Sequence, residues 1–133
     1  MRQLTSHKVN GLNEALKIVV LDEPGAGNAC HKYAIEYPAA EDAAGFRDAE
    51  DQAWKNACVI SFQDGPIAEA GINGISNEAL VAVVIDRLQG FQSGDYKCRE
   101  NAIALTKLEE AMHWLQHRTR ERVSRGVEGT STK

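Results

Sequence analysis

Arginines near the C-terminus are the side chains best suited to ligand chemistry in this sequence of 133 residues. Arg118, Arg122 and Arg125 follow one another at intervals of four and three, so on a helix they share one face, whereas Arg120 points elsewhere. A guanidinium group binds phosphate through paired, charge-assisted hydrogen bonds. The row therefore predicts an anion-binding site. The alternative is a solvated helix end, where the helix dipole favours cations.

A second group of side chains surrounds a predicted loop and has the chemistry to bind a nucleoside. Phe91 stacks on a purine in one interpretation and closes a helical core in the other. Asp95 is suited to accept hydrogen bonds from ribose hydroxyls, or else forms the turn. The amide of Asn101 matches the N6 and N7 edge of adenine, or caps a helix locally. With the arginines, these residues predict a pocket formed where two copies of the chain meet.

The sequence offers little for covalent or metal chemistry. His113 and His117 are one helical turn apart, but no HExxH motif joins them, which favours a solvated or interface pair over a metal site. Glu109 and Glu110 are adjacent and diverge around a helix, so they do not form a carboxylate pair. The P-loop, GxGxxG and GxSxG motifs are absent. We expect no enzyme activity, no bound metal and no cofactor.

The side chains named above depend on a helical hairpin predicted over residues 76–125. Ser76 is the expected N-cap of a helix from Asn77 to about Phe91, and a second helix is expected from about Cys98 to Ser124. Apolar residues recur in the second helix at spacings of three and four, which predicts one buried stripe made of Leu105, Leu108, Met112 and Leu115.

The first half of the chain is predicted to form strands. Compact β-branched or alternating runs indicate strands at 17–21, 29–37 and 58–62, with a further short strand at 67–70. Residues 1–15 are expected to be loop with a short helical turn at 13–16. Strands first and helices afterwards predict an α+β fold, in which a small antiparallel sheet precedes a long C-terminal helical hairpin.

One domain is predicted over residues 1–133. It comprises a sheet part at 1–75 with an acidic insertion at about 39–56, the hairpin at 76–125, and a polar, partly disordered tail at 126–133. Such short elements bury little apolar surface. We therefore expect the long helices to pack against a second copy in a homo-oligomer.

Charge and cysteine content restrict the surroundings in which the protein works. The net charge of −4 argues against a general nucleic-acid binder. No apolar run approaches the length of a membrane span, and residues 1–7 contain no signal-peptide core. The three widely spaced cysteines, Cys30, Cys58 and Cys98, are expected to be buried, reduced thiols in a cytosolic protein.

Short motifs spread over the C-terminal half have a specific pattern of residue types and spacings. They are Gly65-Pro66-Ile67, Gly71-Ile72-Asn73-Gly74, Asn77-Glu78-Ala79-Leu80, Phe91-Gln92, Cys98-Arg99-Glu100-Asn101, Leu108-Glu109-Glu110-Ala111, Trp114-Leu115, Arg118-Thr119 and Arg125-Gly126-Val127-Glu128-Gly129-Thr130. In these motifs the chain resembles the bacteriophage Thoeris anti-defence sponges of the first type. Their helical-hairpin domain is shared with the second anti-CBASS sponge.

The resemblance implies a non-enzymatic protein, encoded by a phage or prophage, that acts in the host cytoplasm. It implies an oligomer, a dimer or a hexamer, that binds cyclic ADP-ribose isomers (gcADPR) and so deprives a defence effector of its signal. It also implies a second site for cyclic oligonucleotides in some members. Alternatives are a sponge for CBASS cyclic di- or trinucleotides, an enzyme that degrades the signal, and a structural or nucleic-acid-binding helical oligomer.

The resemblance also implies roles for individual residues. Phe91 matches the base-stacking aromatic, Asn101 a polar ligand contact, and Arg118 and Arg122 the phosphate-facing arginines. A further arginine comes from the sheet region in the family, and Arg47 is the candidate for it here.

Overall fold

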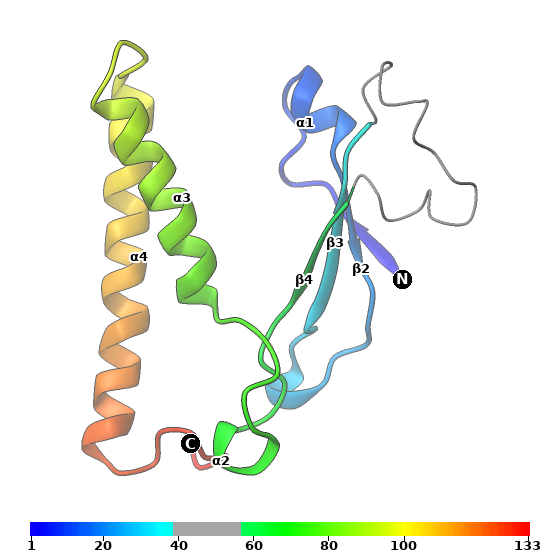
Figure 1. Ribbon diagram of the computed structural model, residues 1–133, viewed down its shortest axis with the longest axis vertical. Helices are drawn as coiled ribbons and strands as arrows, with labels where there is room; N and C mark the ends of the chain where they lie inside the picture. Colours follow the sequence, from blue (N-terminus) through cyan, green and yellow to red (C-terminus); the bar gives the residue numbers. More distant parts are fainter. Residues whose placement is uncertain (39–56) are drawn as a thin grey trace. The chain divides into compact units, whose positions relative to one another are not determined.

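The computed structural model describes residues 1–38 and 57–133, which form two compact units, residues 1–64 and residues 65–133. The predicted acidic insertion at 39–56, including Arg47, lies outside the described residues. The prediction of an α+β fold is confirmed, because a four-stranded antiparallel sheet precedes two long helices that pack together (Figure 1). The single-domain assignment of residues 1–133 stays a prediction.

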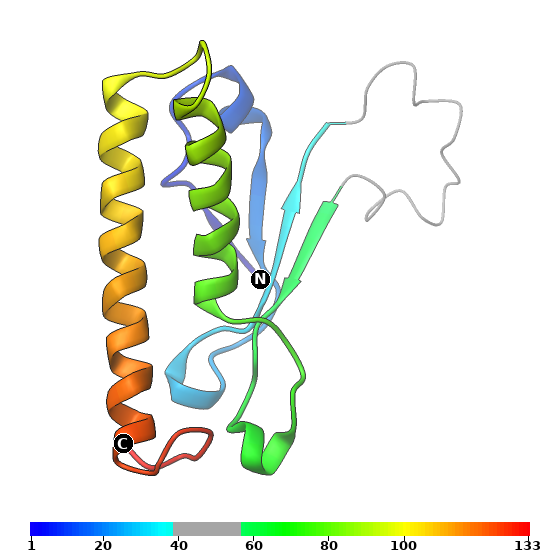
Figure 2. The same cartoon turned by 60° about the vertical axis from the view of Figure 1, so that its left-hand side comes forward.

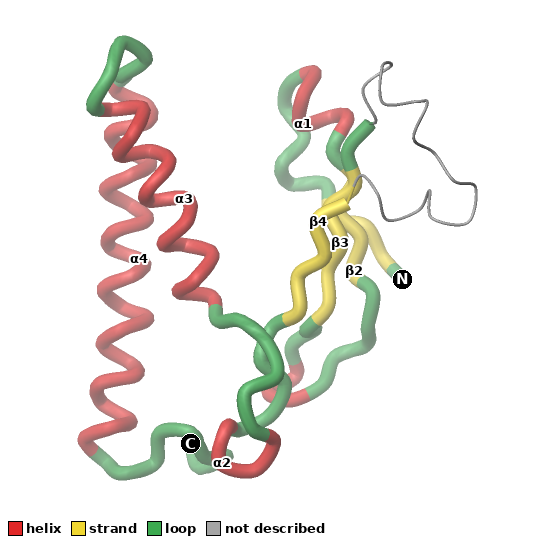
Figure 3. The backbone as a smooth tube through the Cα atoms, in the orientation of Figure 1, coloured by secondary structure: helices red, strands yellow, loops and turns green. Residues whose placement is uncertain are grey.

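The sheet is an antiparallel meander in which each strand pairs with its neighbour in sequence (Figure 3). The predicted strands at 17–21, 29–37 and 58–62 are confirmed with shifted ends. A fourth strand was missed because its three residues, Arg-Gln-Leu, contain no β-branched or aromatic side chain. The four strands are β1 (Arg2–Leu4), β2 (Lys17–Val20), β3 (Lys32–Glu36) and β4 (Ala57–Ser61).

The buried apolar residues of the described chain all belong to residues 1–64. They are Val19, Val20, Cys30 and Ala34. Val19 is the register partner of Ala34 across β2 and β3, so a small side chain faces a branched one at the centre of the sheet. Next to them the ring of Tyr33 meets Phe62 edge to face, with 5.7 Å between the ring centroids.

The predicted short strand at 67–70 is wrong, because these residues form the helix α2 (Ile67–Ala70). Pro66 precedes the first helical residue, where its fixed φ and missing N–H are tolerated. Gly71 ends the helix with φ +70°, a left-handed conformation that favours glycine. The expected helical turn near residue 13 is α1 (Gly11–Ala15), which Asn10 caps by accepting the amide of Asn13 at 2.8 Å. The remaining helical segment is the 3-10 turn η1 (Ala26–Asn28).

The predicted hairpin is confirmed as α3 (Asn77–Gln92) and α4 (Arg99–Ser124), which run side by side (Figure 2). Ser76 is the N-cap of α3, since its side-chain oxygen accepts the amide of Ala79 at 3.1 Å. Cys98 is the N-cap of α4, and its Sγ accepts the amide of Asn101 at 3.4 Å. The predicted α4 stripe of Leu105, Leu108, Met112 and Leu115 is half-buried rather than buried.

Two of the three cysteine predictions are wrong. Cys30 is buried as expected, but Cys58 and Cys98 are exposed, on β4 and at the start of α4. Among the described residues, no helix is both long enough and apolar enough to cross a membrane.

Asp22 fixes the connection between β2 and β3. Its carboxylate accepts hydrogen bonds from the backbone amides of His31 at 2.8 Å and Lys32 at 3.1 Å. Desolvation acts to raise the pKa of Asp22, but the backbone hydrogen bonds prevail and lower the pKa below its ordinary value of 3.8. The folded state therefore favours the ionised carboxylate.

We expect Asp22→Asn to lower stability at neutral pH and to flatten its pH dependence. A carboxyl with a depressed folded pKa contributes stability above the unfolded value of 3.8, and this contribution is lost as pH falls from there through the folded pKa. Urea unfolding followed by circular dichroism at several pH values, from about 7 to about 3, measures the effect. The free energies of unfolding of wild type and Asp22→Asn should converge at the acid end. The control variant Glu23→Gln should keep the wild-type dependence of this free energy on pH. A constant difference at every pH would contradict this role of Asp22.

Candidate ligand-binding site

The predicted nucleoside-binding residues lie together at one end of the hairpin. Phe91 is in the last turn of α3 and is 40% exposed. Asp95 is exposed in the connecting loop, and Asn101 is half-buried in the first turn of α4. The loop is held closed because the side chain of Gln92 accepts the amide of Cys98 at 3.0 Å. We call Phe91, Asp95 and Asn101 the tip group.

Sequence analysis missed a residue beside the tip group. The guanidinium carbon of Arg87 lies 5.6 Å from the ring centroid of Phe91. This is a cation–π contact between residues one helical turn apart on α3. The guanidinium lies over one face of the ring. The spacing of four between an arginine and an aromatic residue on a predicted helix was the available signal.

The predicted arginines at the other end of α4 differ in their surroundings. Arg118 is exposed and makes no hydrogen bond or ion pair with any residue that the structure describes. Arg120 is also exposed and lines an open hollow of about 370 Å³ with Glu78, Gln116 and Thr119. Arg125 pairs with Glu121 at 3.0 Å. Arg118 is therefore the cation of the row that is available to an anion, and Arg120, on another face of α4, is exposed as well.

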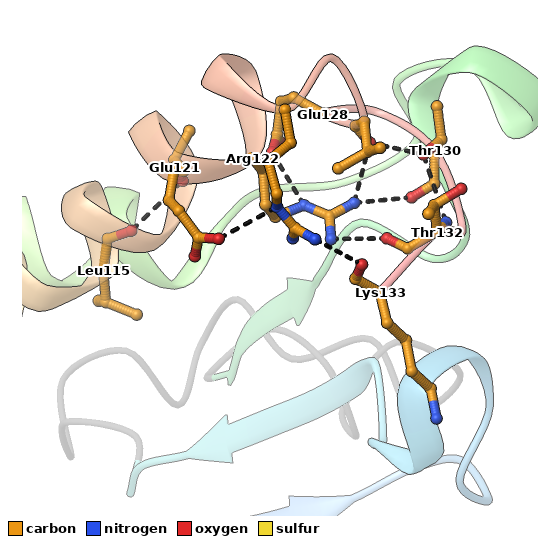
Figure 4. Close-up of polar contacts among 10 residues, drawn as sticks. Leu115, Glu121, Arg122, Glu128, Thr130, Thr132 and Lys133 are labelled. Atoms are coloured by element: carbon orange, nitrogen blue, oxygen red, sulfur yellow. Dashed lines mark hydrogen bonds and ion pairs between the residues drawn. The ribbon is translucent and has the colours of Figure 1, made fainter.

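Arg122 has 8% of its surface exposed and is engaged by the C-terminal segment (Figure 4). Its Nε donates to Oε2 of Glu128 at 3.1 Å, and its two terminal nitrogens donate to backbone carbonyl oxygens. The acceptors are Thr132 at 2.7 Å, Val127 at 3.0 Å and Thr130 at 3.1 Å. These residues of the polar tail, which was predicted to be partly disordered, form turns around the guanidinium.

The two groups of predicted site residues lie at opposite ends of α4. Asn101 and Arg118 are 17 residues apart in one continuous helix, which corresponds to about 25 Å at a rise of 1.5 Å per residue. That distance is far longer than a small cyclic nucleotide. One chain therefore does not bring the tip group and Arg118 to the same small ligand.

The two histidines of α4, His113 and His117, stack on each other. The rings of His113 and His117 are nearly parallel with centroids 6.5 Å apart, and the exposed ring of Trp114 meets both edge to face. The described ranges contain no group of three or more histidine, cysteine, aspartate or glutamate residues placed to hold a metal ion.

The sheet unit contains one arginine among its described residues, Arg2 on β1. It lines a hollow of about 290 Å³ with Lys17 and Glu36, and its guanidinium lies 3.8 Å from Sγ of Cys30. Sequence analysis singled out Arg47 for the sheet arginine and did not consider Arg2, because the strand that carries it was not predicted.

Comparison with known proteins defines the class of the hairpin. A sequence model of the Acb2/Tad1 hairpin domain matches residues 55–120. The chain therefore carries an Acb2/Tad1 hairpin domain, and four of the five predicted site residues fall inside it: Phe91, Asp95, Asn101 and Arg118.

A particular relative extends this result. "Thoeris anti-defense 1" of Bacillus phage SBSphiJ7 is 60% identical to this chain over 74 residues, which is 56% of this chain and 52% of the relative. The chain is thus a homologue of Thoeris anti-defense 1 with an Acb2/Tad1 hairpin domain. The match covers about half the length of that relative.

We expect Arg122→Lys to destabilise the protein much more than Arg118→Lys. A lysine cannot replace the forked guanidinium, so part-buried acceptors around position 122 lose partners, at a cost of about 1–3 kcal/mol. Arg118 is exposed, and its replacement should change the free energy of unfolding by less than about 0.5 kcal/mol. Urea unfolding of both variants measures the difference, and equal effects would show that the Arg122 contacts contribute nothing.

Proposed function

We propose that this protein is a non-enzymatic sponge that binds cyclic ADP-ribose isomers (gcADPR) in the host cytoplasm, so that a phage evades Thoeris-type defence. The observation that carries the proposal is the hairpin-domain match, which spans the tip group and Arg118. The name of the homologous phage protein, an anti-defense protein against Thoeris, points the same way.

The chemistry of the candidate residues supports this ligand class. A cyclic ADP-ribose isomer presents a purine, ribose hydroxyls and a pyrophosphate. Phe91 offers a ring face for stacking, worth roughly 1–3 kcal/mol per base, while Asp95 and Asn101 offer hydrogen-bonding groups. Arg118 offers a guanidinium for the pyrophosphate. Nanomolar affinity, about −12 kcal/mol, is what effective competition with a receptor requires.

The site is proposed to form between two copies of the chain. The separation of about 25 Å along α4 supports an antiparallel arrangement, in which the tip group of one copy meets Arg118 of the other. The described unit of residues 65–133 contains no buried apolar side chain, while Val83, Val84, Ile103 and Trp114 are 40–66% exposed. Covering such residues favours association into a dimer or a hexamer.

The second candidate ligands are cyclic di- and trinucleotides of CBASS signalling. The observation in their favour is that the matching family unites the Tad1 and Acb2 hairpins under one description. Like the cyclic ADP-ribose isomers, they present bases and phosphates that the candidate residues could bind, so both ligand classes belong in one binding panel. If they occupy a separate site, the two classes should bind at the same time without competing.

Degradation of the signal is less well supported than sequestration. The sequence contains no recognisable motif that pairs a nucleophilic side chain with a general base. Sequestration requires only tight binding and slow release. Binding along duplex DNA or RNA is disfavoured by the net charge of −4.

We expect Phe91→Ala and Arg118→Ala each to weaken binding about 10- to 100-fold, because one loses base stacking and the other a charge-assisted contact. Calorimetry against a panel of cyclic ADP-ribose isomers and cyclic di- and trinucleotides measures the loss and identifies the preferred ligand. Lys107→Ala is a matched control, since this lysine is exposed in the middle of α4. Unchanged affinity in both site variants would contradict the assignment, and no binding to any panel member would contradict the function.

Mixed oligomers test the shared site. If each site combines the tip group of one copy with Arg118 of another, a pair of one Phe91→Ala and one Arg118→Ala chain has one intact site and one doubly damaged site. Random co-assembly of equal amounts should restore tight binding at about a quarter of all sites. A site contained within one chain predicts no restoration, and the separately purified variants are the control.

A further inference from the structure

The guanidinium of Arg122 is already occupied by the end of its own chain. Four of its five N–H donors are used, because Nε meets a carboxylate and the terminal nitrogens meet three carbonyl oxygens (Figure 4). Glu128 is the partner with a full charge, and its carboxylate already pairs with Nε of Arg122 at 3.1 Å. A buried guanidinium satisfied in this way has little capacity for a further anion.

The same segment is bound on its other side by α2. The amide of Ala68 donates to the carbonyl oxygen of Gly129 at 3.0 Å. Gly129 has φ +78°, and a Cβ atom at this position would lie 2.9 Å from Cγ1 of Ile67. A glycine is therefore required by both conformation and space. We call Arg122 and residues 127–132 the C-terminal clasp, which joins the last turns of α4 to α2 (Figures 1 and 2).

Arg118, one turn earlier on α4, has the opposite character. It is exposed and makes no hydrogen bond or ion pair with the described part of the chain. Arg122 also accepts the amide of Val127 at 3.1 Å with its own carbonyl oxygen, so both its side chain and its backbone hold the clasp. Of these two arginines on one helical face, Arg122 thus has a nearly complete set of hydrogen-bonding partners, while Arg118 has none among the described residues.

We propose that Arg122 is a positioning residue and not a ligand contact. By binding residues 127–132 it fixes the end of α4 and keeps the Glu128 carboxylate away from Arg118, which is left to bind the phosphate of the ligand. The role of Arg118 rests on the proposed function. The clasp itself does not, so the two parts are tested by separate measurements.

Hydrogen exchange on the full-length protein without ligand tests the clasp. In the Arg122→Ala and Arg122→Lys variants, the backbone amide hydrogens of three residues should exchange at least about tenfold faster than in wild type. These residues are Val127, Thr130 and Ala68. The first turns of α4 should be unchanged. Arg125→Ala is the matched control, because among the described residues the Arg125 side chain contacts Glu121 and the carbonyl oxygen of Lys133, not residues 127–132. Wild-type exchange rates in both Arg122 variants would overturn the clasp.

Exchange in the presence of a cyclic ADP-ribose isomer tests the division of roles. The wild-type segment 127–132 should keep its protection when ligand is bound, because the ligand leaves Arg122 alone. Faster exchange of this segment on ligand addition would mean that the phosphate displaces it from Arg122, and would overturn the proposal. If no isomer binds, the proposed function fails, while the ligand-free comparison still decides the clasp.

The salt dependence of binding separates contact from positioning. Removing a guanidinium that touches the phosphate removes one screened charge contact, so Arg118→Ala should show a shallower dependence of affinity on ionic strength. Arg122→Ala should keep the wild-type slope, and Glu128→Gln should not tighten binding. A shallower slope in Arg122→Ala would make Arg122 a ligand contact and contradict the proposal.

Discussion

The rigid length of α4 controls how this protein can build a ligand site. A helix of 26 residues holds Asn101 near its start and Arg118 near its end, and its regular hydrogen bonding fixes their separation at about 25 Å. Within one chain, the tip group and Arg118 are therefore too far apart to contact the same small ligand. The proposed oligomer with a two-fold axis resolves this, because antiparallel helices would bring the start of one beside the end of the other. The same proposed geometry would cover the apolar residues that are exposed on the hairpin of a single chain.

Electrostatics divides the arginine row into two parts. A buried guanidinium requires hydrogen-bonding partners, since desolvating a charge without them costs several kcal/mol. Arg122 finds these partners in the C-terminal segment of the same chain. Arg118 is exposed and makes no hydrogen bond or ion pair with the described residues. Identical residue types four positions apart thus have different surroundings, because the C-terminal segment folds back onto Arg122 and not onto Arg118.

The sequence was sufficient to predict the elements whose signals are local. Ser76 caps α3 as expected, and the ranges of both long helices follow from apolar spacing and polar ends. The short helix α2 was mistaken for a strand because four residues carry almost no periodicity, and its ends depend on Pro66 and Gly71. Burial was harder to predict. Cys98 is exposed and Cys30 is buried, but the residue type alone does not distinguish the two.

The candidate site shows the same division between local and long-range information. The tip group and Arg118 were predicted from residue types and spacing, and the structure brings the tip group to one end of the hairpin. The burial of Arg122 was not predicted, because it depends on the fold of a polar segment that composition alone suggests is disordered. The contact of Arg87 with Phe91 was not predicted, although its signal, a spacing of four on one helix, is local.

Sequestration without turnover is the central claim, and the fate of the bound ligand tests it most directly. We would saturate the protein with the cyclic ADP-ribose isomer that binds most tightly, hold the complex for several hours, denature it by heat, and separate the released compounds by chromatography. Recovery of the intact isomer in the amount bound is the predicted result. Recovery of a cleaved or linear product would contradict it and identify the protein as an enzyme that removes the signal.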